Sequence, residues 1–313
     1  MTPKVSVIVT TRNQNQTIGQ ALDSILSQKV SFPFEIIIGE DASTDNTRAV
    51  CQEYVERYPD IVKLMPAAPN KGLPKNYFEC IEAASGEYIA DLAGDDFWID
   101  TKKLQMQVDF LDSYPDVVLV HTAWHTVSPD KKTAGESQIQ PLPQTEDGHA
   151  TIIRWLRHSK PLPVHLCTAM YRRTDALNVY RSHRDFLLNQ LIEDFTLTCL
   201  ILVGRKIGYI PVDTLAYTVG GISISNPSGA LDKSRFACNS LDVTYHLADM
   251  TGTPRRYFET AIKPLVHYAI SLAIATHSKD EVKSALAVCK KHKVRLPLKT
   301  HIKLLLFSIL HRI

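Results

Sequence analysis

The segment GEYIADLAGDDFW, which spans Gly86–Trp98, decides the fold. Its first part, Tyr88–Leu92, has the composition of a strand packed inside a sheet. Gly94 then permits a sharp turn, and Asp95 and Asp96 arrive together at the carboxyl end of the strand, the edge at which open α/β sheets bind ligands. Adjacent carboxylates repel each other unless a cation or a proton lies between them, and hard oxygen ligands suit Mg²⁺ or Mn²⁺. The segment therefore predicts a metal site, with a turn that only caps the next helix as the structural alternative.

The composition of the 313-residue chain is that of an ordinary globular protein, with 44% hydrophobic and 22% charged residues. A formal net charge of +2 argues against a dedicated nucleic-acid-binding protein, which usually carries a basic face. Six scattered cysteines form no CxxC pair and no zinc-ligand spacing, which indicates a reducing compartment. The N-terminus does not read as a signal peptide, and no apolar run is long enough to span a bilayer. These features predict a cytoplasmic protein that binds no nucleic acid.

Strands and helices alternate through the first hundred residues. Val5–Val9 is a β-rich run of the kind covered on both faces of a sheet. Further strands are expected at Phe34–Ile38 and Ile61–Met65, and helical periodicity follows each of the three. Together with the strand at Tyr88–Leu92, this alternation predicts an α/β fold with a doubly wound, mostly parallel sheet and right-handed crossovers.

The rest of the chain predicts more sheet and then only helices. The expected helices are Thr101–Ser113, Thr151–Arg157 and Phe186–Val203, and the expected strands are Val117–Val120, Leu166–Tyr171 and Lys206–Ile210. Ser128–His149 is polar and is expected to be a long surface loop. The small-residue loop Gly220–Ser223 is a candidate for closure over a ligand. From about Leu231 the pattern is helical, so we expect a first domain over residues 1–225 and a C-terminal helical segment over residues 226–313.

Four segments in chain order resemble the motifs of an inverting family 2 glycosyltransferase, which has the GT-A fold. They are VSVIVTTRNQ, EIIIGEDASTDNT, GEYIADLAGDDFW and IEDF. They are similar to the first strand and turn, the strand whose closing Asp recognises the base, the strand with the DXD metal motif, and the catalytic-base motif. The resemblance covers roughly residues 3–225 and implies a Rossmann-like GT-A domain.

The resemblance implies a role for each matching residue. Asp41 would accept a hydrogen bond from the uracil N–H, and Thr11 and Arg12 would line the base and the ribose. Asp95 would hold a divalent ion, Mn²⁺ or Mg²⁺, on the two phosphates of a UDP-sugar, and Asp96 would help to orient this donor.

The same resemblance makes Asp194 the base that removes the proton from an acceptor hydroxyl. The chemistry is consistent with these roles, because a metal stabilises the charge of a departing diphosphate and a positioned carboxylate activates a poorly nucleophilic hydroxyl. One attack on the face opposite the leaving group would invert the anomeric configuration.

The chain departs from the family pattern at three places. Ala93 stands where an acidic residue is usual, and Asp91, two residues earlier, points to the same side of the strand. Arg12 replaces a usual Tyr, and a guanidinium can also stack on a base. The segment 217–223 lacks the Arg and His that the family carries there, which leaves the phosphate contacts of this loop open.

Three other features each have a functional and a structural interpretation. Trp98 would line a donor or acceptor pocket, or pack in the core. Glu193 would belong to the same pocket, or complement the positive start of a helix together with Asp194. Lys299–Ile313 would lie on a membrane surface near lipid-linked acceptors, or be a packing appendage.

The sequence thus predicts a glycosyltransferase that moves a hexose or N-acetylhexosamine from a UDP-sugar to a hydroxyl of a glycan or lipid-linked acceptor in the synthesis of a bacterial surface polysaccharide. A nucleotidyltransferase is one alternative, but residues 10–16 lack the Gly and Lys of a phosphate loop. A non-catalytic nucleotide-sugar-binding protein is the other, and Ala93 is the feature that favours it.

Overall fold

The structure is a computed structural model that describes residues 2–67, 69–157, 164–220 and 228–311. The strands are β1 (Val5–Thr11), β2 (Phe34–Glu40), β3 (Val62–Leu64), β4 (Tyr88–Ala93), β5 (Phe97–Trp98), β6 (Val117–Val127), β7 (Thr145–Asp147), β8 (Met170–Arg172) and β9 (Lys206–Thr218). The α-helices are α1 (Ile18–Leu26), α2 (Thr47–Arg57), α3 (Leu73–Ala83), α4 (Lys103–Ser113), α5 (Gly148–Leu156), α6 (Arg173–Leu188), α7 (Asp194–Ile201), α8 (Ala230–Met250), α9 (Lys263–Ala275), α10 (Lys279–Lys291) and α11 (Leu298–His311). Two 3₁₀ turns are η1 (Leu166–Thr168) and η2 (Arg255–Tyr257).

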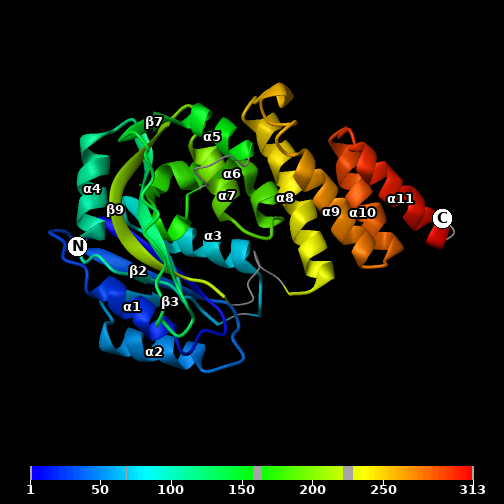
Figure 1. The fold of residues 1–313 in the computed structure, drawn as a ribbon. Helices are drawn as coiled ribbons and strands as arrows, with labels where there is room; N and C mark the ends of the chain where they lie inside the picture. The colour runs from blue at the N-terminus through cyan, green and yellow to red at the C-terminus, as the bar shows by residue number, and fades with distance from the viewer. Residues whose placement is uncertain (1, 68, 158–163, 221–227, 312–313) are drawn as a thin grey trace. The chain divides into compact units, whose positions relative to one another are not determined.

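The first four strands form a parallel sheet in the order β3-β2-β1-β4, as the alternation of strands and helices predicts (Figure 1). In the central register Val9 of β1 lies opposite Ile38 of β2 and Leu92 of β4. The carboxyl ends of these three strands therefore meet at one edge. This is the edge at which an open α/β sheet places its ligands.

Beyond β4 the sheet is mixed. The short strand β8 lies between β4 and β6 and runs antiparallel to both, whereas β6 and β9 are parallel to each other. The strands β5 and β7 pair with β9 in the antiparallel sense. The predicted mostly parallel α/β sheet is therefore confirmed.

Three predicted elements differ in detail. The segment expected as a strand over Leu166–Tyr171 begins as the 3₁₀ turn η1 and joins the sheet only at Met170. The expected surface loop Ser128–His149 contains β7 and the start of α5. The expected helix Phe186–Val203 is in fact interrupted, because α6 ends at Leu188 and α7 begins at Asp194.

Helices cover both faces of the sheet. Val5, Val7 and Val9 of β1 share an apolar core with residues of α1, α2 and α4. On the opposite face α3 packs on β1, β2 and α6, and the ring of Phe78 stacks on the ring of Tyr180 at 4.5 Å. In Figure 1, α4 lies on the left of the sheet and α3 on the right. Both faces of β1 are thus buried, as its continuous β-rich sequence requires.

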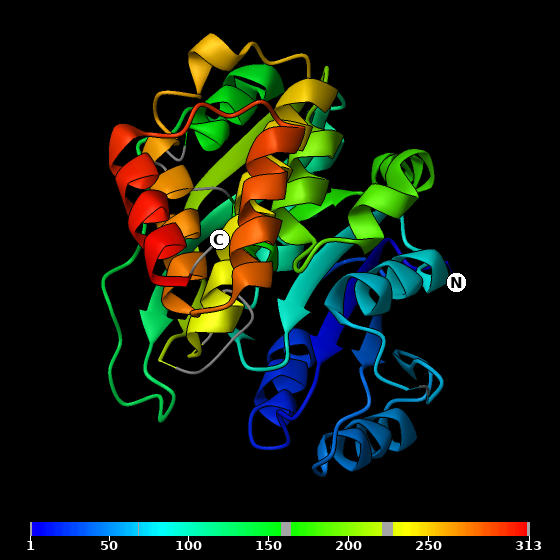
Figure 2. The same cartoon turned by 90° about the vertical axis from the view of Figure 1, so that its right-hand side faces the viewer.

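The described part of the chain divides into two compact units, residues 2–151 with 164–220 and residues 152–157 with 228–311. The second unit is helical: α9 packs against α8, α10 and α11 (Figures 1 and 2). Among the described residues no helix combines the length and the apolar composition needed to cross a membrane. Most of the expected closing loop Gly220–Ser223 and the expected boundary between residues 225 and 226 lie outside the described residues.

Candidate active site

Asp95 and Asp96 stand on a tight turn, the acidic turn, at the end of β4. The backbone N–H of Asp96 donates to the carbonyl oxygen of Ala93 over 3.1 Å, so Gly94 and Asp95 occupy the centre of the turn. A Cβ atom on Gly94 would lie 2.6 Å from the Thr11 Oγ1 and 2.9 Å from the Thr11 Cβ on β1. Glycine is therefore needed here because the turn packs against Thr11.

Thr218 contacts both acidic residues of the turn. Thr218, the last residue of β9, donates its backbone N–H to the Asp96 Oδ1 over 2.8 Å, and its hydroxyl donates to the Asp95 carbonyl oxygen over 2.6 Å. Burial raises the pKa of the Asp95 carboxyl, and a hydrogen bond to Gln14 opposes this rise. Burial also raises the pKa of Asp96, and the neighbouring charge of Asp95 raises it further. The turn thus concentrates negative charge that a cation would relieve.

A lysine from the segment predicted to be a loop reaches the same turn. The Lys131 Nζ donates to the Asp95 carbonyl oxygen over 3.1 Å and to the Thr218 hydroxyl. It also lies 5.1 Å from the centre of the Phe97 ring. Sequence reasoning missed Lys131, and nothing in its local sequence distinguishes it from Lys132.

The end of β2 forms a second cluster. Asp41 is buried, and its carboxylate accepts hydrogen bonds from the Asn70 side chain at 2.8 Å, the Lys71 backbone N–H at 2.9 Å and the Gly72 backbone N–H at 3.0 Å. The Asp41 N–H donates to the Thr11 carbonyl oxygen over 3.1 Å. Asp41 therefore joins the ends of β1 and β2 to the loop before α3.

The other predicted nucleotide-binding residues lie at this edge too. Thr11 is buried, and its hydroxyl donates to the Gln14 side-chain oxygen over 2.7 Å, so Gln14 contacts both Thr11 and Asp95. Arg12 follows directly and is exposed. Asp45 accepts hydrogen bonds from the Thr47 backbone N–H and hydroxyl and is therefore a turn residue.

The predicted base lies at the start of α7. Burial raises the pKa of Asp194, and the Phe195 N–H, which donates to the Asp194 Oδ1 over 2.5 Å, opposes the rise. Glu193 precedes it, is buried, and has a pKa raised to about 8 by burial and then by the charge of Asp194. The break before α7 places both acids at a helix N-terminus instead of inside one long helix.

Tyr217 connects the acidic turn with the predicted base. Burial raises the pKa of its hydroxyl to about 12, and the charges of Asp96, Asp95 and Asp194 raise it in the same direction. The Tyr217 ring also contacts His165, with the ring centres 4.2 Å apart. Tyr217, the neighbour of Thr218 on β9, therefore lies within electrostatic range of Asp95, Asp96 and Asp194.

The family model described as "Glycosyl transferase family 2" matches residues 6–178, more than half of the chain. The chain belongs to this family. The predicted resemblance to this family is therefore confirmed, and the match covers three of the four motifs. The match contains the acidic turn and the Asp41 cluster, whereas Asp194 lies beyond it.

A relative shares sequence with part of this glycosyltransferase. The Escherichia coli protein WfgD, named UDP-Glc:alpha-D-GlcNAc-diphosphoundecaprenol beta-1,3-glucosyltransferase, is 33% identical over 107 residues, which are 34% of this chain and 40% of WfgD. The chain aligns with less than half the length of the curated relatives it matches.

Solved glycosyltransferases share the fold over a larger part of the chain. Staphylococcus aureus TarS, crystallised with UDP-GlcNAc, gives a TM-score of 0.56 at 16% identity and covers 93% of this chain and 91% of that one. The Pyrobaculum calidifontis mannosyltransferase PcManGT, in complex with GDP-Man and Mn²⁺, gives 0.56 at 19% identity and covers 100% and 81%. The predicted GT-A fold of this family 2 member is confirmed.

The donor set of the glycosyltransferase fits a divalent ion shared with a substrate. Among the residues that the structure describes, no three His, Cys, Asp or Glu side chains converge as a metal site. Asp91 does not join Asp95, because it is buried and accepts a long hydrogen bond of 3.4 Å from the Tyr171 hydroxyl. One or two carboxylates plus phosphate oxygens are a usual Mg²⁺ environment, and the turn of Asp95 and Asp96 offers that number.

Trp98, predicted to line a pocket or to pack in the core, is part of the apolar core of the sheet domain. Its side chain is 4% exposed, and its indole N–H donates to the Cys167 carbonyl oxygen over 3.0 Å. The buried ammonium of Lys103 lies 4.2 Å from the centre of its ring. Of the two neighbouring aromatic residues, Phe97 is the one near the acidic turn. It is half-buried and lies beside Lys131, which binds the turn.

Proposed function

We propose that this family 2 glycosyltransferase transfers a hexose or N-acetylhexosamine from a UDP-sugar to a hydroxyl of a glycan or lipid-linked acceptor, with inversion, in the synthesis of a bacterial surface polysaccharide. The observation that carries the proposal is the turn of Asp95 and Asp96 at the carboxyl end of β4, which Thr218 and Lys131 hold by hydrogen bonds in a chain of this family. The name of WfgD, with its UDP-Glc donor and lipid-diphosphate acceptor, supports the substrate class. The UDP-GlcNAc complex of TarS supports the same type of donor.

The nucleotide lies, in this proposal, across the ends of β1 and β2. Asp41 accepts a hydrogen bond from the uracil N–H, and its three bonds to residues 70–72 hold the carboxylate in place for that purpose. Thr11 and Arg12 line the base and the ribose. A carboxylate offers about four lone-pair sites, so the three existing bonds leave room for one more donor.

The diphosphate lies at the acidic turn. Asp95, with Asp96 beside it, holds a divalent ion, Mn²⁺ or Mg²⁺, and the complex of PcManGT with Mn²⁺ supports the assignment. When bound, the ion stabilises the charge of the departing nucleoside diphosphate. Thr218 fixes the direction of the Asp96 carboxylate through its backbone N–H.

Asp194 removes the proton from the acceptor hydroxyl as it attacks the anomeric carbon. Its pKa is raised by burial, which makes the carboxylate a stronger base than one in water. Glu193, with a pKa raised to about 8, stays largely protonated near pH 7 and does not compete as a second base. It is therefore a neutral neighbour of the reacting carboxylate.

We further propose that the protein works at the cytoplasmic face of a membrane. All six cysteines are free thiols, in keeping with a reducing compartment. In this proposal the catalytic domain comprises residues 1–225, except for residues 152–157, which belong to the helical unit. The helical segment 226–313 provides the membrane contact.

The exposed face of α11 supports this contact. Its apolar side chains lie on one stripe and are between 53% and 77% exposed: Leu298, Ile302, Leu305, Leu306 and Ile309. On the opposite face Phe307 and Thr300 are buried. The apolar residues of this helix thus form two faces, of which one packs inward and the other has the character of an interfacial helix.

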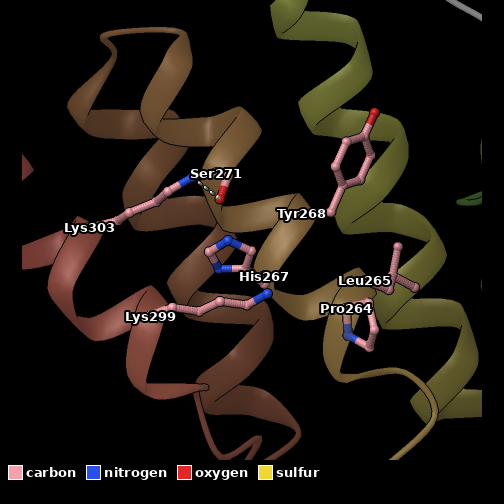
Figure 3. Close-up of a pocket in the computed structure, with 7 residues that line it drawn as sticks. All are labelled: Pro264, Leu265, His267, Tyr268, Ser271, Lys299 and Lys303. Atoms are coloured by element: carbon pink, nitrogen blue, oxygen red, sulfur yellow. Dashed lines mark hydrogen bonds between the residues drawn. The ribbon is translucent and has the colours of Figure 1, made fainter.

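Basic residues flank the stripe. Figure 3 shows Lys299 and Lys303 of α11 beside a groove of α9, where the Lys303 Nζ donates to the Ser271 hydroxyl over 3.0 Å. Residues 228–311 carry 13 Lys and Arg but only 6 Asp and Glu. This charge favours an anionic lipid surface as the partner of α11.

The test is calorimetric titration of UDP, GDP and CMP, with Mn²⁺ and in EDTA, on the wild type, Asp95→Ala and the exposed control Asp60→Ala. The proposal expects UDP to bind most tightly, Mn²⁺ to strengthen binding, and only Asp95→Ala to remove the effect of Mn²⁺. Tighter binding of GDP or CMP would contradict the UDP assignment. Binding of UDP without turnover in any acceptor extract would favour a nucleotide-sugar-binding protein.

A further inference from the structure

A cation from outside the recognised motifs stands at the acidic turn. We propose that Lys131 is a fixed cation of the donor site and binds a phosphate oxygen of the nucleoside diphosphate beside Asp95 and Asp96. The inference rests on the proposed function, because it assigns a further binding residue to the same site.

The first support is the position of the ammonium group. The Lys131 Nζ donates to the Asp95 carbonyl oxygen and to the hydroxyl of Thr218, which itself binds the acidic turn. An ammonium has three N–H donors, and these two contacts leave a third for a phosphate oxygen. The ammonium group is therefore one hydrogen bond away from the main chain of the turn that carries Asp95 and Asp96.

The second support is the rigidity of the segment that carries Lys131. Its N–H donates to the Ser128 carbonyl oxygen over 2.9 Å, and the Ser128 N–H donates to the Thr133 carbonyl oxygen over 2.8 Å. The Ser128 hydroxyl also bonds Asp130 over 2.6 Å and accepts from the Thr133 N–H. Lys131 adopts a φ of +58°, a conformation that costs energy for a residue other than glycine and that the closed turn maintains.

The third support is the place at which the turn meets the sheet. The Val219 N–H donates to the Val127 carbonyl oxygen over 2.9 Å, so the end of β9 and the start of the Lys131 turn are fixed to each other. Residues 217–223 contain no Lys or Arg of their own. Lys131 therefore brings to the end of β9 the positive charge that this segment lacks.

Lys132 provides a matched control. It is adjacent in sequence, but its side chain is 82% exposed and pairs only loosely with Asp130 at 3.6 Å. If only the net positive charge of the turn mattered, replacement of either lysine would weaken binding equally. If Lys131 contacts the diphosphate, only the replacement of Lys131 should weaken binding.

The experiment is calorimetric titration of UDP and of uridine against the wild type, Lys131→Met, Lys131→Arg and Lys132→Met, with Mn²⁺ and in EDTA. We expect Lys131→Met to weaken UDP binding about 10-fold to 100-fold, as for the loss of a hydrogen bond to a charged group. Uridine affinity should not change, Lys131→Arg should recover part of the loss, and Lys132→Met should match the wild type. Circular dichroism melting curves verify that each variant is folded.

Two results would overturn the inference separately from the proposed function. If the wild type binds UDP and Lys131→Met binds it equally well, only the role of Lys131 fails. An equal loss for UDP and uridine would make Lys131 a structural residue of the turn. If the wild type prefers GDP, the UDP assignment fails, and the same variants tested with GDP and guanosine decide the role of Lys131. If it binds neither nucleotide, both proposals fail.

Discussion

The hydroxyl of Thr218 donates to the carbonyl oxygen of Asp95 over 2.6 Å, and the Thr218 N–H holds the Asp96 carboxylate. The last residue of β9 therefore orients both acids of a turn that belongs to β4. Thr218 binds the Asp96 carboxylate through its backbone N–H. A substitution of the Thr218 side chain would therefore leave this hydrogen bond in place. The acidic turn itself is the part of the site that substitutions can test most directly.

Gly94→Ala should disturb the acidic turn by steric overlap. The new Cβ would meet Thr11 at 2.6 Å, and Thr11 is fixed in the sheet. We expect the free energy of unfolding to fall by about 1–3 kcal/mol. Calorimetry should show a loss of the Mn²⁺ effect on UDP binding. Gly229→Ala is the control, because its nearest atom would lie 3.7 Å away, and equal behaviour of the two variants would contradict the prediction.

Asp41→Asn should affect both stability and nucleotide binding. The amide would replace a carboxylate oxygen that accepts N–H donors from residues 70–72, and one donor to the buried Asp41 side chain would lose its partner. Such a loss costs about 1–3 kcal/mol. Urea unfolding and UDP titration should both show the change, whereas Asp60→Asn should show neither. Unchanged UDP affinity in a destabilised Asp41→Asn protein would reduce Asp41 to a structural residue.

Glu193→Gln should change how stability depends on pH. The Glu193 pKa is raised from 4.5 to about 8, so its stabilising contribution is complete below about pH 4.5 and disappears as the pH rises through about 8. Asp91, whose pKa is raised to about 7, acts in the same direction, and the lowered pKa of Lys103 acts in the opposite one. The comparison with wild type isolates Glu193.

The free energy of unfolding should be measured at pH 5, 7 and 9. Between pH 5 and pH 9 the stability of Glu193→Gln relative to wild type should rise by about 1 kcal/mol or more, since one pKa unit corresponds to about 1.4 kcal/mol. Glu82→Gln, at an exposed position, should keep a constant difference. A constant difference for Glu193→Gln as well would show that burial does not perturb its carboxyl.

Asp194→Asn should greatly lower the rate of sugar transfer without weakening the binding of the donor. Removal of a general base costs about 10²-fold to 10⁴-fold in rate. Release of UDP from a UDP-sugar in the presence of an acceptor extract should fall by that factor, and UDP affinity should stay at the wild-type value. Asp185→Asn, on the exposed end of α6, is the control. Full activity of Asp194→Asn would show that Asp194 is not the catalytic base.

The double change Leu305→Gln and Leu306→Gln should weaken binding to lipid vesicles. Both side chains are more than half exposed on the stripe of α11, and burial of each in a membrane interface would contribute about 1.5–3 kcal/mol at most. Sedimentation with phosphatidylglycerol vesicles should fall at least about 10-fold. Leu231→Gln, exposed on α8, should leave it unchanged. Equal binding to phosphatidylcholine, or a wild type that forms dimers instead, would contradict an anionic membrane as the partner.

The sheet could be predicted from sequence where its strands are long and apolar. The strands β1, β2 and β4 are continuous runs between turn residues, and the recognisable acids follow β2 and β4. The short strand β8 could not be predicted in the same way, because three residues contain no periodicity. The apolar residues of 186–203 concealed the break at Asn189–Glu193, which depends on the end of α6 at Asn189 and the start of α7 at Glu193.

The candidate site could be predicted only as far as its acids. Asp41 and Asp95 follow strands that local sequence reveals, whereas Asp194 is predicted from its motif alone, because the start of α7 is concealed. Gln14, Lys131 and Thr218 are ordinary polar residues of turns and strand ends, and only the folded chain brings them to the acidic turn. Their local sequence does not indicate a role in the site, because each reaches the acidic turn only through a contact with a distant part of the chain.

The bond between Thr218 and Asp95 joins positions 123 residues apart. A ribosome that has produced β1 to β4 has made every element needed for the parallel half of the sheet, but not the strand that orients the two acids. During synthesis the nascent acidic turn therefore lacks its β9 partners until residue 218 has left the exit tunnel. If the acidic turn holds the donor as proposed, the donor site is therefore completed only after β9 has been synthesised.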